Sequence, residues 1–316
     1  MRTLLNKADG VRSIGRRAFM KLIGVGGATA LLDTSKARAA EVAEAARREP
    51  AMGVLVDTTL CVGCRSCEAA CNEANGLPKP ERPFDDDTVL DQMRDTSPTA
   101  FTVVNRYEIS KDVQITRKQQ CMHCREPACS SACIIRAMEK QSNGAVTYRD
   151  DLCIGCRYCM VACPFNVPKF EYSSAVPLIK KCTFCFERQK EGKQPACVEV
   201  CPADALTFGK RSQLLKEAKK RIHADPKSYI HDVYGEQELG GTSWLYIAGV
   251  PFEQLGLPTL DNKVYPELTS GAMSTVPAVL LMWPALLMGF HYFFHGKDGA
   301  HDEHSRHDGP PRGSEK

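Results

Sequence analysis

Cys153-Ile154-Gly155-Cys156-Arg157-Tyr158-Cys159-Met160-Val161-Ala162-Cys163-Pro164 is the stretch of this 316-residue chain that says most about its fold. Its four cysteines are separated by two, two and three residues, and a proline follows the last one. The first three thiolates of such a run can surround one corner of a cubane iron–sulfur cluster, whereas the fourth starts a helix and reaches the neighbouring cluster. Gly155, inside the first gap, suits a tight loop with a positive φ angle. The stretch therefore predicts a site shared by two neighbouring [4Fe-4S] clusters.

All 16 cysteines of the chain fall into four quartets of this kind. One other quartet repeats the spacing, and the remaining two widen the second gap to four and to eleven residues. The quartets are Cys61, Cys64, Cys67 and Cys71; Cys121, Cys124, Cys129 and Cys133; Cys153, Cys156, Cys159 and Cys163; and Cys182, Cys185, Cys197 and Cys201. We expect all of these residues to be the metal ligands of four [4Fe-4S] clusters.

Two other uses of cysteine explain this pattern less well. An even number of cysteines in an exported protein suits disulfide bonds, but disulfides do not require a fourfold spacing, and a chain of this length needs no such density of cross-links. Zinc ribbons pair two C-x2-C motifs and do not close a quartet with a three-residue gap. Ligation of iron–sulfur clusters therefore explains the spacing best.

The segments around the quartets repeat as well. Residues 54–60 and 146–152 each predict a short strand and a polar turn directly before a quartet, and residues 206–208 predict a closing strand. We expect an α+β fold of two nested 2[4Fe-4S] ferredoxin-like units with short strands and helices, plus one C-terminal transmembrane helix. The outer quartets would form one unit and the inner quartets the other.

Crossed ligation within these units predicts four sets of ligands, which are named here after their first member. The Cys61 set is Cys61, Cys64, Cys67 and Cys201. The Cys71 set is Cys71, Cys182, Cys185 and Cys197. The Cys121 set is Cys121, Cys124, Cys129 and Cys163, and the Cys133 set is Cys133, Cys153, Cys156 and Cys159.

Residues 1–39 resemble an export signal of the twin-arginine type. Arg16 and Arg17 open the motif, residues 22–32 form an uncharged run too short to span a bilayer, and residues 37–39 supply a small-x-small cleavage pattern. A basic tail on an amphipathic helix is the alternative. Without these residues the chain has 33 basic and 36 acidic side chains, so its net charge of +3 belongs to the signal.

The C-terminal part contains a candidate membrane helix. No Asp, Glu, Lys or Arg occurs between Glu267 and Lys297, and residues 272–294 are mostly apolar. Because about 20 helical residues cross a hydrocarbon core, we expect a transmembrane helix there, with a buried helix of a soluble protein as the alternative. His291 either faces a quinone or haem of a partner subunit or reaches the interface. The tail after it either binds metal or is solvated, and its histidines are His295, His301, His304 and His307.

The chain is thereby divided into five predicted segments. These are a twin-arginine signal over 1–39, a four-cluster domain over 40–235, an extended connector over 236–271, a transmembrane helix over 272–294 and a His-rich tail over 295–316. Within them, residues 212–224 predict an amphipathic helix and Trp244 a core residue. Residues 72–120 form a long insertion that either docks a partner or is a solvated loop.

Composition and motifs narrow the function further. Charged residues make up 25% of the chain and hydrophobic ones 43%, which is typical of neither a disordered nor a polytopic protein, and the small net charge argues against nucleic acid as a partner. No segment resembles a nucleophile–base pair, a phosphate-binding loop or an open metal position. We therefore expect fully ligated clusters that transfer electrons, and no catalytic residue.

Basic residues near the quartets are candidates for tuning reduction potentials, because an oxidised cluster with four thiolates carries a charge of about −2. The sequence singles out none of them, and most are expected to be ordinary surface charges. They are Lys111, Lys118, Lys140, Lys169, Lys180, Lys181, Arg125, Arg157 and Arg188.

Several motifs together resemble the four-cluster ferredoxin-like electron-transfer subunits of membrane-bound respiratory oxidoreductases. The resemblance covers roughly residues 52–265, and it is strongest to the iron–sulfur subunits of uptake [NiFe] hydrogenases that face the periplasm. The motifs are Cys121-Met122-His123-Cys124, residues 153–164, Cys197-Val198-Glu199-Val200-Cys201-Pro202-Ala203, Val233-Tyr234-Gly235-Glu236, Gly240-Gly241-Thr242 and Gly249-Val250-Pro251-Phe252-Glu253.

The resemblance implies partners and a location. Electrons from H2 would pass from the hydrogenase large and small subunits into this chain and leave to an integral membrane subunit that reduces quinone, as part of anaerobic respiration. The chain would lie on the periplasmic side of the cytoplasmic membrane with a single C-terminal anchor in the bilayer. Similar subunits serve formate dehydrogenases and other molybdopterin oxidoreductases, which is the main alternative. A zinc- or disulfide-stabilised assembly protein is a third.

Overall fold

The computed structural model describes residues 51–295, without the side chains of residues 269–274 and 295. The chain divides into two units, of which the larger runs from Arg38 to Leu268 and the other includes the residues from Thr269 onward. The predicted twin-arginine signal and the tail after His295 lie outside the described residues.

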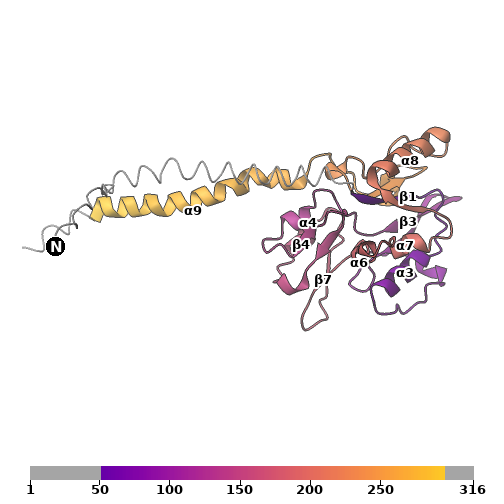
Figure 1. Ribbon diagram of the computed structural model, residues 1–316, viewed down its shortest axis with the longest axis horizontal. Helices are drawn as coiled ribbons and strands as arrows, with labels where there is room; N and C mark the ends of the chain where they lie inside the picture. Colours follow the sequence, from indigo (N-terminus) through magenta and orange to yellow (C-terminus); the bar gives the residue numbers. More distant parts are fainter. Residues whose placement is uncertain (1–50, 296–316) are drawn as a thin grey trace, which may run out of the picture. The chain divides into compact units, whose positions relative to one another are not determined.

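A three-stranded sheet with β1 in its centre forms the core of the larger unit (Figure 1). β1 (Met52–Asp57) pairs antiparallel with β8 (Leu206–Lys210) and parallel with β9 (Trp244–Ile247). The aliphatic run in β1 is buried from Gly53 onward, as expected for a strand that is covered on both faces. The strands predicted before the first quartet and after the last one are confirmed, and they are hydrogen-bonded neighbours.

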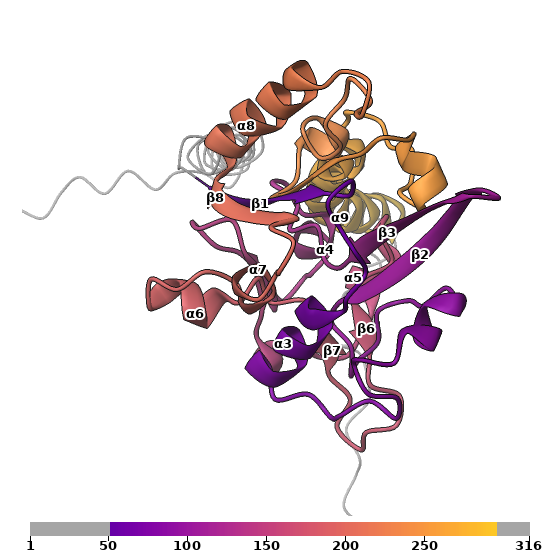
Figure 2. The ribbon, with the colours of Figure 1, turned by 90° about the vertical axis from the view of Figure 1, so that its right-hand side faces the viewer.

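The helix α8 (Arg211–Ala224) covers one face of this sheet (Figure 2). Leu214, Ala218 and Ile222 recur every four residues, so they form one apolar stripe, which is buried against Leu55 of β1. The amphipathic helix predicted for residues 212–224 is therefore confirmed. Alternate residues of β1 point to the opposite face, where Val54 packs in the largest hydrophobic cluster together with cysteines of the outer quartets.

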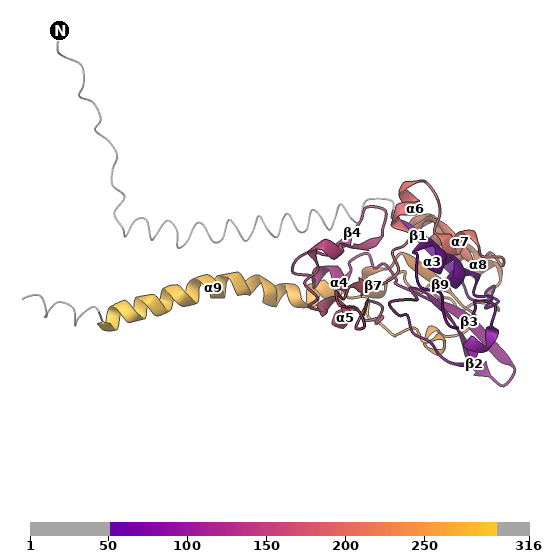
Figure 3. The same cartoon turned by 90° about the horizontal axis from the view of Figure 1, so that it is seen from below.

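Short helices carry the third cysteine of each quartet. α3 (Ser66–Ala74) and α7 (Ala196–Glu199) carry those of the two outer quartets and pack against each other. α4 (Ala128–Ser131) and α5 (Tyr158–Val161) carry those of the inner quartets and are also in contact (Figure 3). The fold thus brings the outer quartets together and the inner quartets together.

Antiparallel strand pairs fill the segments between consecutive quartets. These pairs are β2 (Val103–Ser110) with β3 (Val113–Gln119), β4 (Met138–Lys140) with β5 (Val146–Tyr148), and β6 (Lys169–Phe170) with β7 (Ile179–Lys180). The strand predicted directly before the third quartet is β5. The other elements are α6 (Phe186–Lys190) and the 3-10 helices η2 (Asp87–Asp91), η3 (Asp150–Leu152), η4 (Glu238–Gly240) and η5 (Phe252–Leu255).

From Leu90 onward the insertion over residues 72–120 is packed against the domain, whereas residues 78–83 are exposed and contain no helix or strand. Val103 and Val104 of β2 are each 1% exposed. Asn105 is fully buried and fixes the preceding segment, because its Nδ2 donates to the Arg94 carbonyl at 2.7 Å and its Oδ1 accepts from the Arg94 amide at 3.0 Å. This part of the insertion therefore belongs to the packed domain, and the role of the insertion in docking a partner stays a prediction.

The structure differs from the extended connector predicted for residues 236–271. β9 lies within this segment and completes the central sheet, and Trp244 and Ile247 are fully buried. Phe252 of η5 packs into the same core. Proline and glycine are frequent in tight turns between core segments as well as in linkers. Their frequency in this segment therefore did not distinguish an extended connector from a packed part of the domain. Trp244 is confirmed as a core residue.

The helix α9 (Tyr265–His295) contains the predicted membrane span and begins earlier than the predicted residue 272. Its segment Thr275–Phe294 has a mean hydropathy of 1.5, and none of it is buried. Pro277 and Pro284 lie inside the helix. Among the described residues, this is the helix whose length and composition suffice to cross a membrane.

Candidate metal centres

The loop between the first two cysteines of every quartet has the same left-handed turn. The residue before the second cysteine has a φ of 72° at Gly63, 46° at His123, 70° at Gly155 and 59° at Phe184. Glycine adopts this conformation at little cost, as predicted for Gly63 and Gly155. His123 and Phe184 are buried and stack on each other with ring centroids 4.9 Å apart. This contact joins the loops of the second and fourth quartets.

The cysteines of the Cys61 set line one cavity. Three of them come from the first quartet, and the fourth comes from the last quartet, 130 or more positions further along the sequence. Gly63 and Lys118 line the same cavity. This is the arrangement that crossed ligation requires, because the cavity holds the first three cysteines of one outer quartet and the last cysteine of the other.

The cysteines of the Cys71 set are also neighbours. Burial raises the pKa of the Cys71 thiol well above its usual value, and the thiols of Cys182, Cys197 and Cys185 raise it further. Cys71 and Cys182 share one hydrophobic cluster. The last cysteine of the first quartet thus lies beside the first three cysteines of the last quartet.

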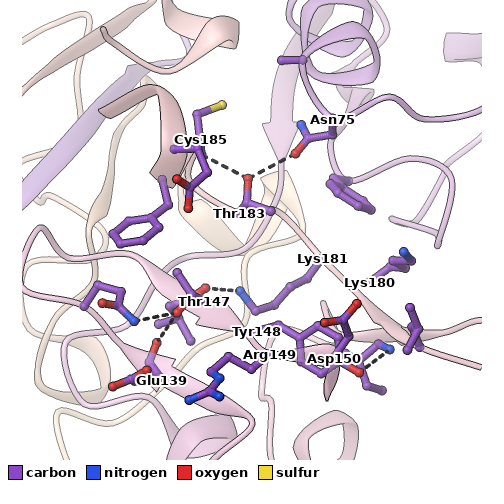
Figure 4. A pocket seen from close by; sticks show the side chains of 18 of the residues that line it. Asn75, Glu139, Thr147, Tyr148, Arg149, Asp150, Lys180, Lys181, Thr183 and Cys185 are labelled. Atoms are coloured by element: carbon purple, nitrogen blue, oxygen red, sulfur yellow. Dashed lines mark hydrogen bonds between the residues drawn. The ribbon is translucent and has the colours of Figure 1, made fainter. Parts of the chain in front are cut away.

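Asn75 and Thr183 connect the two halves of this set (Figure 4). Asn75 Nδ2 donates to the Cys71 carbonyl at 2.8 Å and lies 3.6 Å from Cys71 Sγ. Thr183 Oγ1 donates to Asn75 Oδ1 at 3.2 Å and accepts from the Cys185 amide at 3.2 Å. These residues border an open cavity of about 570 Å³ and fix the backbone of two ligand loops relative to each other.

The inner quartets supply the other two sets. Burial raises the pKa of the Cys124 thiol, and the other thiols of the Cys121 set raise it further. Burial likewise raises the pKa of Cys159 to about 11, to which the other thiols of the Cys133 set contribute. In both sets, three cysteines of one inner quartet have the fourth cysteine of the other quartet as a neighbour.

Backbone amides point at several of the sulfur atoms. The Ala137 amide donates to Cys133 Sγ at 3.1 Å. The Gly155 amide donates to Cys153 Sγ and the Phe184 amide to Cys182 Sγ, each at 3.4 Å. Hydrogen bonds of this kind to ligand sulfurs help to set the reduction potential of a cluster.

The donor set fits iron–sulfur clusters. All sixteen cysteines are free thiols, and six of them are buried. Burial raises the pKa of Cys182 and of Cys129 to about 12, because a buried thiolate loses its hydration. Sulfur atoms in such places become thiolates beside strong positive charge, which the irons of a cluster supply. Within residues 51–295 no three His, Cys, Asp or Glu side chains are placed to hold one metal ion. In a cluster, by contrast, each cysteine binds a different iron.

Two lysines that the sequence did not distinguish from surface charges are buried among these sets. Lys118 is 2% exposed, and its Nζ lies 4.5 Å from the ring centroid of Trp244. Lys181 is 5% exposed, and its Nζ donates to the carbonyls of Cys182, at 3.1 Å, and of Val146. In the sequence, both lysines are marked only by their position shortly before the first cysteine of a quartet. This position does not show whether a lysine is buried.

A buried ion-pair network supports the loop of the first quartet, and sequence reasoning missed it. Glu68, 5% exposed, accepts from Arg65 Nη2 at 3.0 Å and from Arg94 Nη2 at 2.6 Å. Its Oε1 also accepts from the Val104 amide at 2.6 Å. Because Arg65 directly follows Cys64 and the other donors belong to the insertion, the network ties the ligand loop to the insertion.

Comparison with known proteins agrees with this chemistry. A family model described as a 4Fe-4S dicluster domain matches residues 113–211, which contain three of the four quartets. A protein of Nitratidesulfovibrio vulgaris (strain Hildenborough) is 53% identical over 87% of this chain and 75% of its own length. Hydrogenase-2 operon protein HybA of Escherichia coli O157:H7 is 38% identical, over 83% of this chain and 87% of its own length. The iron–sulfur subunit of the nitrate-inducible formate dehydrogenase of Escherichia coli K12 is 32% identical, over 80% and 89%.

Proposed function

Because this chain belongs to the iron–sulfur electron-transfer subunits of hydrogenase and formate dehydrogenase-type complexes, we propose that it relays electrons through four [4Fe-4S] clusters. The electrons would come from the catalytic dimer of a periplasmic [NiFe] hydrogenase and leave to a quinone-reducing membrane subunit. The observation that carries this proposal is the grouping of sixteen free cysteines into four sets of neighbours. Each set provides the four thiolates that one cluster needs, and a bound cluster takes up and releases one electron at a time.

Two observations favour a hydrogenase over a formate dehydrogenase or another molybdopterin oxidoreductase. The identity to the hydrogenase-2 protein is 38%, against 32% to the formate dehydrogenase subunit. The chain also begins with a signal resembling the twin-arginine type, whereas in molybdopterin complexes the catalytic subunit often carries this signal. The formate dehydrogenase role is the second candidate.

The order of the clusters along the path follows from neighbouring thiols of different sets. Burial is the main reason that the pKa values of Cys67, Cys182 and Cys129 are raised. Each of these values is raised further by a neighbouring thiol that belongs to another set. The three pairs are Cys67 with Cys197, Cys182 with Cys121, and Cys129 with Cys159. They join the Cys61 set to the Cys71 set, that set to the Cys121 set, and the Cys121 set to the Cys133 set. We infer a linear path in this order.

Both ends of this path reach the surface. Cys64 of the Cys61 set and Cys156 of the Cys133 set are the two exposed cysteines. Val62 and Ile154, each 69% exposed, lie in the corresponding loops, and Ile134 beside Cys133 is 87% exposed. Exposed apolar side chains around a redox centre suit the docking of a partner subunit, so we assign the entry and exit of electrons to these two surfaces.

The same proposal includes a location. The cluster domain would be exported by the twin-arginine route, lie on the periplasmic side and be anchored by α9, with the short tail in the cytoplasm. The exposed apolar segment Thr275–Phe294 supports the anchor. The domain bounds that we propose keep the signal at 1–39 and extend the four-cluster domain to Leu268, the end of the larger unit.

Metal analysis of the complex purified through a tag on this chain tests the function. We expect about four irons for each cysteine set, together with a nickel-containing large subunit. Co-purification of a molybdenum subunit instead would establish the second candidate. Colourless material with little iron, prepared without oxygen, would refute both.

A pair of substitutions tests crossed ligation. We expect Cys201→Ser to change the spectrum of the cluster held by Cys61, Cys64 and Cys67. Cys197→Ser should change the cluster of the Cys71 set and leave the first one intact. If each quartet held its own cluster, cluster-resolved electron paramagnetic resonance would show both substitutions changing the same cluster and leaving that of Cys61, Cys64 and Cys67 intact, which would refute crossed ligation.

A further inference from the structure

Lys118 is a buried cation beside two sets of cysteines. It belongs to β3, is 2% exposed and lines the cavity of the Cys61 set. Its Nζ donates to Gln120 Oε1 at 3.1 Å and lies over the ring of Trp244. Gln120 in turn donates from Nε2 to the Tyr246 hydroxyl at 2.7 Å, so the lysine is held in a fixed position by neighbours that are themselves buried.

No carboxylate offsets this charge in the part of the chain that the structure describes, because none of the ion pairs there involves Lys118. An isolated buried ammonium is costly. Trp244, over whose ring the ammonium lies, packs in one hydrophobic cluster with Cys67 and Cys197. Burial opposes the charge, but the sulfur atoms of Cys197, Cys67, Cys182 and Cys71 together favour it, and the pKa of Lys118 is raised. Cys67 belongs to the Cys61 set and Cys197 to the Cys71 set, so the positive charge is balanced by sulfur from both.

Resting on the proposed function, we propose that the buried ammonium of Lys118 raises the reduction potentials of the clusters in the Cys61 and Cys71 sets. A cluster gains one negative charge when it takes up an electron. A buried cation nearby therefore stabilises the reduced cluster more than the oxidised one. Removing the cation lowers the potential, and an arginine in the same place preserves it.

Lys181 provides a matched comparison at a different place. Its Nζ donates to the carbonyl of Cys182, a member of the Cys71 set, and its charge lowers the pKa of the Cys129 thiol in the Cys121 set. Substitution of Lys181 removes a buried cation, just as substitution of Lys118 does. It should act on the Cys71 and Cys121 sets and spare the Cys61 set, whereas Lys118 acts at the Cys61 end.

The test is a redox titration of the full-length chain purified with its clusters, followed by electron paramagnetic resonance. Iron and sulfide are measured first in every sample, and the clusters are assigned with the Cys201→Ser and Cys197→Ser variants. We expect Lys118→Met to lower the potentials of two of the four clusters, those of the Cys61 and Cys71 sets. Lys118→Arg should restore them, and Lys220→Met, which removes an exposed charge on α8, should shift none.

Unchanged potentials in fully loaded Lys118→Met protein would overturn the proposal. A downward shift of equal size in Lys118→Arg would also overturn it, because that result assigns the effect to packing and not to charge. Where Lys118→Met fails to assemble its clusters, Lys118→Gln, which keeps a polar side chain near Gln120, must show the same downward shift. Wild-type protein without clusters would refute the proposed function instead, before any lysine variant is compared.

Discussion

Glu68 is a single carboxylate on which three donors of the first cysteine loop and the insertion depend. Glu68→Gln keeps the shape but leaves Arg65, 3% exposed, as an uncompensated buried cation. We expect a loss of about 3 kcal/mol of stability, because breaking a buried ion pair is strongly destabilising. The measurement is the urea dependence of the loss of visible absorption in cluster-loaded protein.

The matched control is Glu217→Gln. Glu217, with 39% of its side chain exposed, pairs with Arg221 on the surface of α8. An exposed pair of this kind contributes about 0.3–0.5 kcal/mol, so the variant should unfold almost as the wild type does. An equal loss of stability in the two variants would show that the buried network around Glu68 stabilises the protein no more than an exposed ion pair does.

Among single residues, the sequence predicted which cysteines lie together in the structure, but not which other side chains surround them. The sixteen cysteines were recognisable because their spacing is local. Lys118 and Glu68 were not, because their burial depends on β3 and the insertion folding over the first quartet. A lysine before a cysteine gives the same local pattern whether it is buried or exposed.

Among the elements, the first loop of each quartet can be compared directly. Gly63 and Gly155 have nearly equal φ angles of 72° and 70°. A Cβ at Gly63 would lie 2.8 Å from Thr116 Cγ2 of β3, whereas at Gly155 the nearest atom is Phe170 Cε2 at 3.8 Å. Alanine costs about 1–2 kcal/mol at both positions for its backbone conformation. We expect Gly63→Ala to add a steric cost, which lowers the iron content of the purified chain below that of Gly155→Ala.

A second substitution separates the two contributions at Gly63. Thr116→Ser removes Cγ2 but keeps the hydroxyl, which donates to the Cys61 carbonyl at 2.8 Å. The double variant Gly63→Ala/Thr116→Ser should therefore recover the iron content of Gly155→Ala. If the iron content of the double variant stayed at the level of Gly63→Ala, the loss of iron would be due to the backbone conformation of the loop and not to contact with Thr116.

The elements also show where local patterns stop being informative. β1, β5, β8 and α8 were predictable because hydrophobic periodicity and position relative to a quartet are visible in the sequence. The place of β9 in the central sheet was not predictable, since parallel pairing with β1 joins residues that are far apart in the chain. The proline- and glycine-rich segment around it therefore looked like a linker.

For the whole molecule, the division into two units predicts that the proposed membrane anchor can be removed without loss of the larger unit. A chain ending at Leu268 retains the larger unit, with every cysteine and the complete central sheet, and lacks the apolar segment Thr275–Phe294. We expect the full-length chain to stay with the membrane after extraction with alkaline carbonate and the shortened chain to be released with its iron. Release of the full-length chain, or retention of the shortened one in cells lacking partner subunits, would contradict the anchor.

The central position of β1 has a consequence for biosynthesis. The Thr58 hydroxyl at the end of β1 donates to the Ile247 carbonyl of β9, 189 residues later. At about 5–20 residues per second, a ribosome needs on the order of 10–40 s to make that stretch. During this interval β1 lacks its parallel partner β9, although β8 becomes available earlier, and the sheet is complete only when translation of the domain is nearly finished. Chaperones have that interval in which to shield β1 and keep the early thiols from oxidising.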